Sequence, residues 1–164
     1  MPKYTVGIPV FLREDAHRQV VIDTLESIKE NSSDVEIIIV NNGSTVMSGF
    51  LKDYADIYIE NKENLGISPA WNKILNSSKT EYVVICNDDI LVPPYWLETL
   101  EEPFYEHMNC GVSAPMAGGP NEVPAILMGR NSLENYKYYP GYCFMLKRDR
   151  FFEKFDERFV PFNF

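Results

Sequence analysis

Cysteine and histidine are scarce in this sequence of 164 residues, which has three cysteines and two histidines. Cys86, Cys110 and Cys143 are far apart, no C-x-x-C pair occurs, and His17 does not lie near a cysteine along the chain. Structural zinc sites need closely spaced ligands, and disulfide frameworks usually need an even number of cysteines. The sequence therefore argues against both, and we expect three reduced thiols in the core.

Long apolar runs and an excess of positive charge are also missing. No stretch approaches the about 20 apolar residues of a membrane-spanning helix, and the N-terminal apolar segment is too short for a signal peptide. We therefore expect a cytoplasmic chain without a membrane span. The formal net charge is −9, whereas a nucleic-acid binder carries a basic patch. Nucleic acid is thus excluded as a partner, and a ligand with phosphates would need a metal ion to offset the repulsion.

What the sequence does contain is the composition of a folded domain, with 45% hydrophobic and 24% charged residues. Apolar patterns and turn residues predict strands at 4–8, 35–40, 57–59, 82–86, 112–115 and 141–146. They predict helices at 16–30, 48–54, 69–78 and 93–107. This βα order predicts an α/β fold, with a mostly parallel sheet covered by helices on both sides.

Three prolines and one serine refine the predicted boundaries. Pro9 is expected to stop the first strand, and Pro103 to kink or split the last helix. Ser68 is expected to cap the helix at 69–78, with Pro69 in its first turn.

Two adjacent carboxylates form the most informative motif. Asn87, Asp88 and Asp89 directly follow the apolar run 82–86, which is typical of a buried strand. Two carboxylates at such a place need a counter-charge, and Mg²⁺ or Mn²⁺ typically bridges such a pair to substrate phosphates. Asn and Asp also end strands simply by forming turns, so the motif alone leaves both interpretations open.

Polar clusters follow the first and second predicted strands as well, at residues 13–15 and 41–44. Ligands of parallel sheets bind at the carboxyl ends of the strands. The three clusters, at 13–15, 41–44 and 87–89, would therefore lie at one edge of the sheet. Their convergence predicts a single site.

Five stretches follow one another in a distinctive order. They are Ile8-Pro9-Val10, VEIIIVNNGST (35–45), ENLGISPAWNKIL (63–75), EYVVICNDDILVPPYWLETL (81–100) and GYCFMLKRDRFFEKFDERFVPFNF (141–164). In this order the chain resembles the family-2 glycosyltransferases with the A-type (GT-A) fold along essentially its whole length. The resemblance implies one domain, 1–164, with a three-layer α/β/α nucleotide-diphospho-sugar transferase fold. Residues 1–110 would form the nucleotide-sugar-binding half, and 111–164 an incomplete acceptor half.

The resemblance also implies an activity. A sugar, a hexose or a related one, would pass from a nucleotide-diphosphate donor to a hydroxyl of a carbohydrate or glycoconjugate acceptor, with inversion and with Mn²⁺ or Mg²⁺ as cofactor. Asp89 would bind the metal, and Asp88 would face the ribose or the sugar. Asn42 stands where the family usually has a base-binding Asp. The implied donor-binding residues are Pro9, Val10, Asn42, Asn64, Gly66, Asn72 and Asp88.

The family's catalytic base has no counterpart in the sequence. Inverting members use a carboxylate to deprotonate the acceptor, usually just after an aromatic stretch like 159–164. Because the chain ends at Phe164, we expect the base beyond it, and Asp156 and Glu157 match a preceding element. One alternative is a donor-binding fragment without transfer. A nucleotidyltransferase is disfavoured, because no glycine-rich basic loop follows the first strand.

The remaining candidates are expected to have structural roles. No catalytic role is predicted for His17 or His107, because neither has ligand residues nearby in the sequence. Packing is predicted for Trp71 and Trp96. A surface charge cluster is predicted for Lys147, Arg148 and Arg150.

Overall fold

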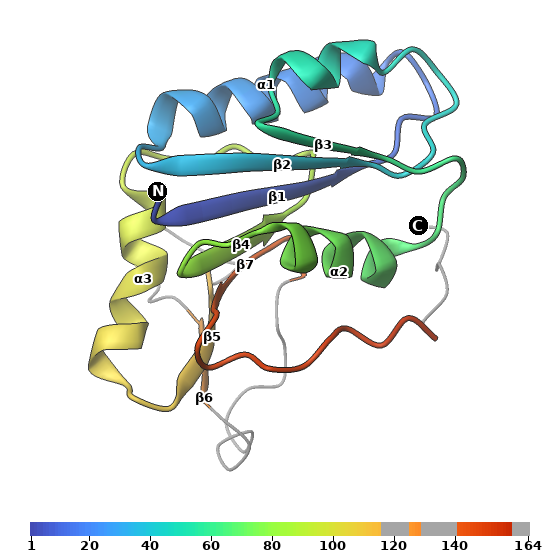
Figure 1. The fold of residues 1–164 in the computed structure, drawn as a ribbon. Coiled ribbons are helices and arrows are strands. Elements are labelled where there is room, and N and C mark those ends of the chain that lie inside the picture. Colours follow the sequence, from blue (N-terminus) through green and yellow to red (C-terminus); the bar gives the residue numbers. More distant parts are fainter. Residues whose placement is uncertain (116–124, 129–140, 159–164) are drawn as a thin grey trace.

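A sheet of seven strands, in the order β3-β2-β1-β4-β7-β5-β6, runs through the protein (Figure 1). The structure, a computed structural model, describes residues 1–115, 125–128 and 141–158, the side chains of 125–128 excepted. The strands are β1 (Tyr4–Val10), β2 (Val35–Asn41), β3 (Ile57–Glu60), β4 (Tyr82–Cys86), β5 (Cys110–Ala114), β6 (Ala125–Met128) and β7 (Cys143–Lys147). The helices are α1 (His17–Asn31), the 3-10 helix η1 (Gly49–Asp53), α2 (Ile67–Ser77) and α3 (Trp96–Glu106).

The strand directions confirm the predicted mostly parallel sheet. β1 pairs in parallel with β2 and β4, and β2 pairs in parallel with β3. β7 is antiparallel to both β4 and β5, so β5 runs in the direction of the first four strands. Only β7 and β6, which is antiparallel to β5, run the other way. β6 was not predicted from the sequence.

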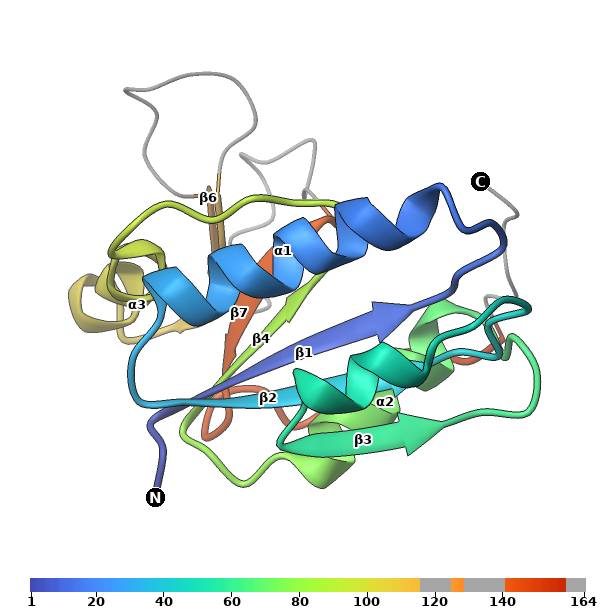
Figure 2. The ribbon, with the colours of Figure 1, turned by 90° about the horizontal axis from the view of Figure 1, so that it is seen from above.

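Helices cover both faces of the sheet, which confirms the three-layer α/β/α fold (Figures 1 and 2). On one face, α1 and α3 bury Leu25, Ile28, Leu97 and Leu100 against alternate strand residues. On the other face, α2 buries Ala70 and Ile74 against Ile38, Val40 and Ile85. In the part of the chain that the structure describes, no helix is both long and apolar enough to cross a membrane.

Gly7 lets α2 lie directly against β1. A Cβ atom added to Gly7 would stand 2.1 Å from Cγ2 of Ile74, closer than real carbon atoms approach. The missing side chain therefore fixes the height of α2 above the sheet, and with it the position of the residues that α2 carries.

The β4–β7 pair joins the parallel part of the sheet to its C-terminal strands. Cys86 of β4 stands opposite Cys143 of β7. Both are free thiols and are almost completely buried, as is Cys110. The prediction of three reduced core cysteines is confirmed.

The first strand extends beyond its predicted end. β1 continues through Pro9 to Val10, because its pairing with β2 reaches Val10 and Asn41. Its pairing with β4 stops earlier, at Gly7. The N–H that proline lacks therefore falls where β1 has one neighbour instead of two, which is where a sheet tolerates proline.

Two helix predictions also need correction. α2 is capped by Gly66 and not by Ser68. The φ of Gly66 is 91°, a conformation that favours glycine. α3 begins at Trp96, after Tyr95 in a left-handed conformation, and it continues through Pro103. The buried side chains of Trp96, Leu100 and Phe104 explain why the lost hydrogen bond does not split α3.

Arg148 and Arg150 hold backbone carbonyls and are not simply surface charges. Arg148 donates to the carbonyls of Ser78 and Thr80, both at 2.9 Å. Nη1 of Arg150 lies 3.1–3.2 Å from three carbonyls, those of Phe104, His107 and Cys110. Both therefore fasten the turns around α2 and α3.

Glu101 is a buried carboxylate near the amino end of β1, and it is 3% exposed. It accepts a hydrogen bond of 2.7 Å from Lys3, and further ones from the hydroxyls of Tyr4 and Tyr105. Burial alone would raise the pKa of Glu101, but the bonds from Lys3, Tyr105 and Tyr4 outweigh it and hold that pKa below its ordinary value. A lowered carboxylate pKa stabilises the fold above the unfolded-state pKa of about 4.3, and this stability is lost as the pH falls through the folded-state pKa.

Glu101→Gln is therefore expected to lower the free energy of unfolding at pH 7 by about 1–3 kcal/mol, because charged hydrogen bonds become neutral ones. The loss should shrink as the pH falls below about 4. Urea unfolding between pH 3 and 8 measures this. The control is Glu102→Gln, at an exposed position next in the chain. An acid dependence of unfolding that is the same in native protein and Glu101→Gln would contradict the prediction.

Candidate functional site

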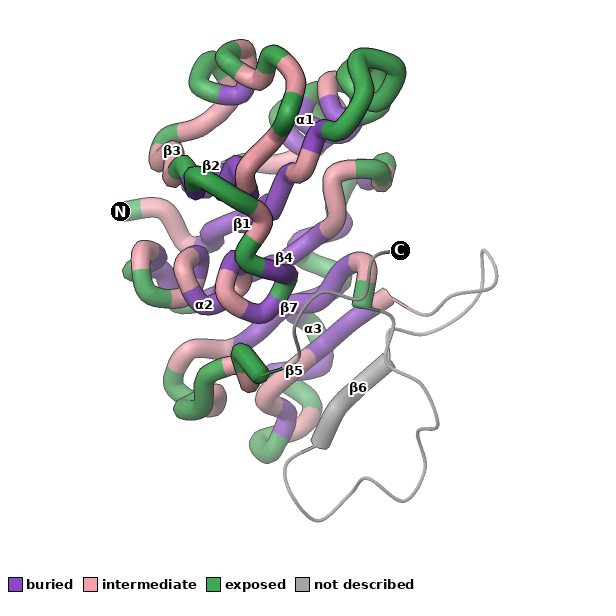
Figure 3. Tube along the Cα trace, turned by 90° about the vertical axis from the view of Figure 1, so that its right-hand side faces the viewer, coloured by how far each residue is buried: buried purple, intermediate pink, exposed green. Residues whose placement is uncertain are grey.

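The residues that follow β1 and β2 meet at one edge of the sheet. The backbone N–H of Asn42 donates to the carbonyl of Val10 at 2.7 Å. Leu12 donates its N–H to the hydroxyl of Ser44 at 2.9 Å and accepts from the N–H of Thr45 at 2.9 Å. Figure 3 looks at this carboxyl edge, where the buried ends of β1, β2 and β4 lie among exposed loops. The predicted convergence of polar segments is thus a feature of the fold.

A cleft of about 530 Å³ opens at this edge, between the end of β4 and the start of α1. Its lining consists of Phe11, Arg13, His17, Val20, Val21, Asp88 and Asp89. The guanidinium of Arg13 lies 5.0 Å from the centre of the Phe11 ring. The acid pair therefore shares a ligand-sized space with an aromatic ring, a guanidinium and an imidazole.

The structure distinguishes the two aspartates. Asp88 is half-buried and Asp89 is exposed. Desolvation and the charge of Asp89 raise the pKa of Asp88 to about 6, against the opposing influence of the Phe11 backbone and His17. The carbonyl of Asp88 accepts from the Thr24 hydroxyl at 3.0 Å, which ties the turn to α1. The backbone of the acid pair is therefore tied to α1, and its negative charge is only partly compensated.

A divalent cation fits this pair, provided that the ligand supplies the other donors. Among the described residues, no three His, Cys, Asp or Glu side chains are grouped to hold a metal by themselves. Mg²⁺ and Mn²⁺ typically take one or two protein carboxylates together with substrate phosphates. Asp88 and Asp89 supply two hard oxygen donors, which match that arrangement.

Asn42 organises the loop 61–66 that precedes α2. Its side chain is 4% exposed, and Nδ2 donates to Oδ1 of Asn64 at 2.9 Å and to the carbonyl of Gly66 at 3.0 Å. Its Oδ1 accepts from Nδ2 of Asn61 at 2.8 Å and from the N–H of Leu65 at 3.2 Å. Both donors and both lone pairs of the amide are thus used. The structure brings Asn42, Asn64 and Gly66 together in one network.

The other predicted donor-binding residues take no part in these side-chain bonds, although the carbonyl of Val10 accepts from the N–H of Asn42. Pro9 and Val10 are buried in β1 beside β2. Asn72, in the second turn of α2, contacts residues 155 and 157. The carbonyl of Tyr142, which directly precedes β7, accepts from the N–H of Asn87 at 2.7 Å.

His17 is the cleft residue that its sequence neighbourhood did not indicate. It is the first residue of α1 and lines the same space as Asp88 and Asp89. Its distance from Asp88 along the chain hid this proximity. The available signal was its place at the start of the helix that follows β1, because that helix begins at the carboxyl edge.

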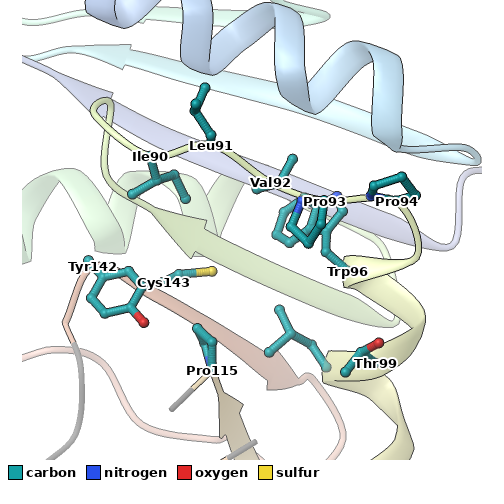
Figure 4. A pocket seen from close by; sticks show the side chains of 11 residues that line it. Ile90, Leu91, Val92, Pro93, Pro94, Trp96, Thr99, Pro115, Tyr142 and Cys143 are labelled. Atoms are coloured by element: carbon teal, nitrogen blue, oxygen red, sulfur yellow. The ribbon is translucent and has the colours of Figure 1, made fainter. Parts of the chain in front are cut away.

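An apolar pocket of about 310 Å³ begins directly after the acid pair (Figure 4). Figure 4 shows Ile90, Leu91 and Val92 along one side, and Tyr142 and Cys143 along the other. α3 contributes Trp96, whose Nε1 donates to the hydroxyl of Ser32 at 2.9 Å. The segment after Asp89 is therefore held by apolar packing, and Trp96 has the structural role predicted for it.

Residues 5–158 match the sequence model of the family described as "Glycosyl transferase family 2". The chain belongs to this family. A curated relative, glycosyltransferase GlyA of Streptococcus pneumoniae serotype 4, is 33% identical over 111 residues, which are 64% of this chain and 15% of the relative. This glycosyltransferase domain thus spans a small part of that relative's length.

Solved structures show the same fold. S. aureus TarS 1-349 in complex with UDP-GlcNAc aligns with a TM-score of 0.58 and 17% identity, over 73% of this chain and 36% of that TarS 1-349 chain. The mannosyltransferase PcManGT of Pyrobaculum calidifontis, in complex with GDP-Man and Mn²⁺, aligns with a TM-score of 0.56 and 21% identity, over 70% of this chain and 35% of that protein. The two structural alignments show that this family-2 glycosyltransferase has the GT-A fold.

Proposed function

We propose that this domain binds a nucleotide-diphosphate sugar together with Mn²⁺ or Mg²⁺, and transfers the sugar to a hydroxyl of a carbohydrate or glycoconjugate acceptor with inversion. The observation that carries the proposal is the pair Asp88 and Asp89, which opens into a cleft of about 530 Å³ at the carboxyl edge of the sheet. The solved complexes of TarS 1-349 with UDP-GlcNAc and of PcManGT with GDP-Man and Mn²⁺ support this class of donor.

The two aspartates would have different roles. Asp89, which is exposed, would bind the cation, while Asp88, which is half-buried, would accept hydrogen bonds from the ribose or the sugar. When bound, the cation would stabilise the negative charge that builds on the leaving diphosphate. Pro9 and Val10 would line the nucleobase pocket, and Asn42 would shape it through Asn64 and Gly66.

A second candidate is donor binding without transfer. Two carboxylates near the end of the described chain are already engaged: Asp156 bonds Arg158, and Glu157 accepts from Asn72 at 2.8 Å. Neither is held toward the cleft as a base. The base is proposed to lie beyond Phe164, and transfer would require it.

Calorimetric titration tests the donor site directly. UDP, GDP, dTDP and their sugars would each be titrated with Mn²⁺ and with chelator. We expect one base to bind, and the affinity to fall at least about tenfold on metal removal, because diphosphate and acid pair then repel each other. Failure of all three nucleotides to bind with Mn²⁺ would reject the proposal. Binding without sugar transfer would support the second candidate.

A further inference from the structure

The side chain of Asn72 joins α2 to the last described segment of the chain. Its Nδ2 donates to the carbonyl of Phe155 at 2.9 Å, and its Oδ1 accepts from the N–H of Phe155 at 2.9 Å. Nδ2 also donates to Oε1 of Glu157 at 2.8 Å. The amide thus bonds both backbone groups of one residue, as a neighbouring strand would.

Aromatic side chains reinforce this contact. The ring of Phe155 lies 4.8 Å from that of Trp71, 5.9 Å from that of Phe144 and 5.7 Å from that of Phe151, measured between centres. Residues 151–158 contain neither helix nor strand. Side-chain contacts at Phe155 therefore set the path of this segment. In a strand, backbone hydrogen bonds to the neighbouring strand would do so.

The path leads toward the candidate site. β7 ends at Lys147, which pairs with Tyr82 at the amino end of β4. From there the chain returns beside α2 toward the edge where β1 and β2 end (Figure 1). Asn72 is the point at which the returning chain is fastened to α2, whose first turn follows the network of Asn42.

We propose that Asn72 is a positioning residue, which fixes the path of residues 151–158 beside α2 toward the carboxyl edge of the sheet. It was expected to contact the donor, but it is 3% exposed, and both protons of its amide are already donated to Phe155 and Glu157. A bond from Nδ2 to the donor would cost one of these contacts. The inference rests on the proposed function, because residues 151–158 would belong to the acceptor half of that domain.

We call the bonds from Asn72 to Phe155 and Glu157 the tether. It is tested by hydrogen exchange of residues 151–158 in Asn72→Ala and Asn72→Asp. Asp at this position cannot donate to Phe155, and it faces the Glu157 carboxylate. Asn76→Ala, at an exposed position one turn further along α2, is the matched control. We expect exchange at least about tenfold faster in both Asn72 variants and unchanged exchange in the control. Unchanged exchange in folded Asn72 variants would overturn the tether.

Glu157→Ala gives a second reading that leaves the core untouched, because Glu157 is exposed. It removes one of the contacts of Asn72, so exchange should rise by about threefold. If Asn72→Ala fails to fold, Glu157→Ala tests the tether in its place. Exchange of residues 151–158 at the native rate in Glu157→Ala would then overturn the tether.

Donor binding and turnover separate positioning from direct contact. UDP affinity with Mn²⁺ should stay within about twofold in Asn72→Ala. In a form of the protein that carries the base, kcat for transfer should fall at least about tenfold with KM for the donor unchanged. A raised KM with unchanged kcat would return Asn72 to the donor site and overturn the inference. If the native protein bound no nucleotide, the proposed function would fail, whereas exchange would still report on the tether.

Discussion

Asp89→Ala is expected to weaken metal-dependent nucleotide binding by at least about 100-fold, since loss of a ligand should exceed the 10–100-fold cost of losing a residue that only supports one. Asp89 is exposed at the mouth of the cleft and belongs to neither core cluster. The melting temperature should therefore stay within about 2 °C of the native value. Binding would be lost from a folded protein.

Calorimetry with UDP and Mn²⁺, alongside a thermal melt, measures both quantities. Asp149→Ala is the matched control, because Asp149 is an exposed aspartate in the turn after β7. It should bind as the native protein does. Native affinity in Asp89→Ala would remove Asp89 from the site, and it would leave Asp88 as the carboxylate to examine.

Asn42→Ala is expected to have the largest effect on the donor loop. It would remove one hydrogen bond each from Asn61, Asn64, Leu65 and Gly66, and Oδ1 of Asn64 would keep another, from the N–H of Gly66. Each buried group without a partner costs about 1–3 kcal/mol, and part of this is recovered if the loop opens to water. We expect the free energy of unfolding to fall by about 2–4 kcal/mol, and nucleotide affinity to fall with it.

The companion variant is Asn42→Asp, which introduces the residue that the family usually has. A carboxylate still accepts from Asn61 and Leu65 but cannot donate to Asn64 or Gly66. Urea unfolding should place it between native protein and Asn42→Ala. Asn109→Ala, at an exposed asparagine, serves as control. If Asn42→Asp proved as stable as the native protein, the amide donors of Asn42 would be dispensable.

Much of the fold was predictable because its signals are local. The strand 82–86 has the bounds that its apolar run and following turn residues indicate. The alternation of strands and helices was sufficient to predict the layers. Local signals failed where a neighbour decides the outcome. Pro9 stays in β1 because β4 has already separated from it there, and α3 continues through Pro103 because its buried face holds it.

The site divides in the same way. Asp88 and Asp89 are adjacent in sequence and follow a strand, so their chemistry was evident without a structure. The place of His17 in the cleft and the contact of Asn72 with Phe155 each join residues far apart in the chain. Such contacts depend on how helices pack on the sheet, and one sequence carries no periodic signal for them. The aromatic stretch 159–164 lies outside the described residues.

The facing thiols of Cys86 and Cys143 have a practical consequence. Burial raises the pKa of Cys143 to about 12, and it raises that of Cys86 well above its ordinary value. Neither thiol is reactive while β4 and β7 remain paired, because thiolates are the reactive form and need access. The rate at which an alkylating reagent labels them therefore measures how often these two strands separate. Cys86 and Cys143 therefore report on the separation of β4 and β7 without any introduced label.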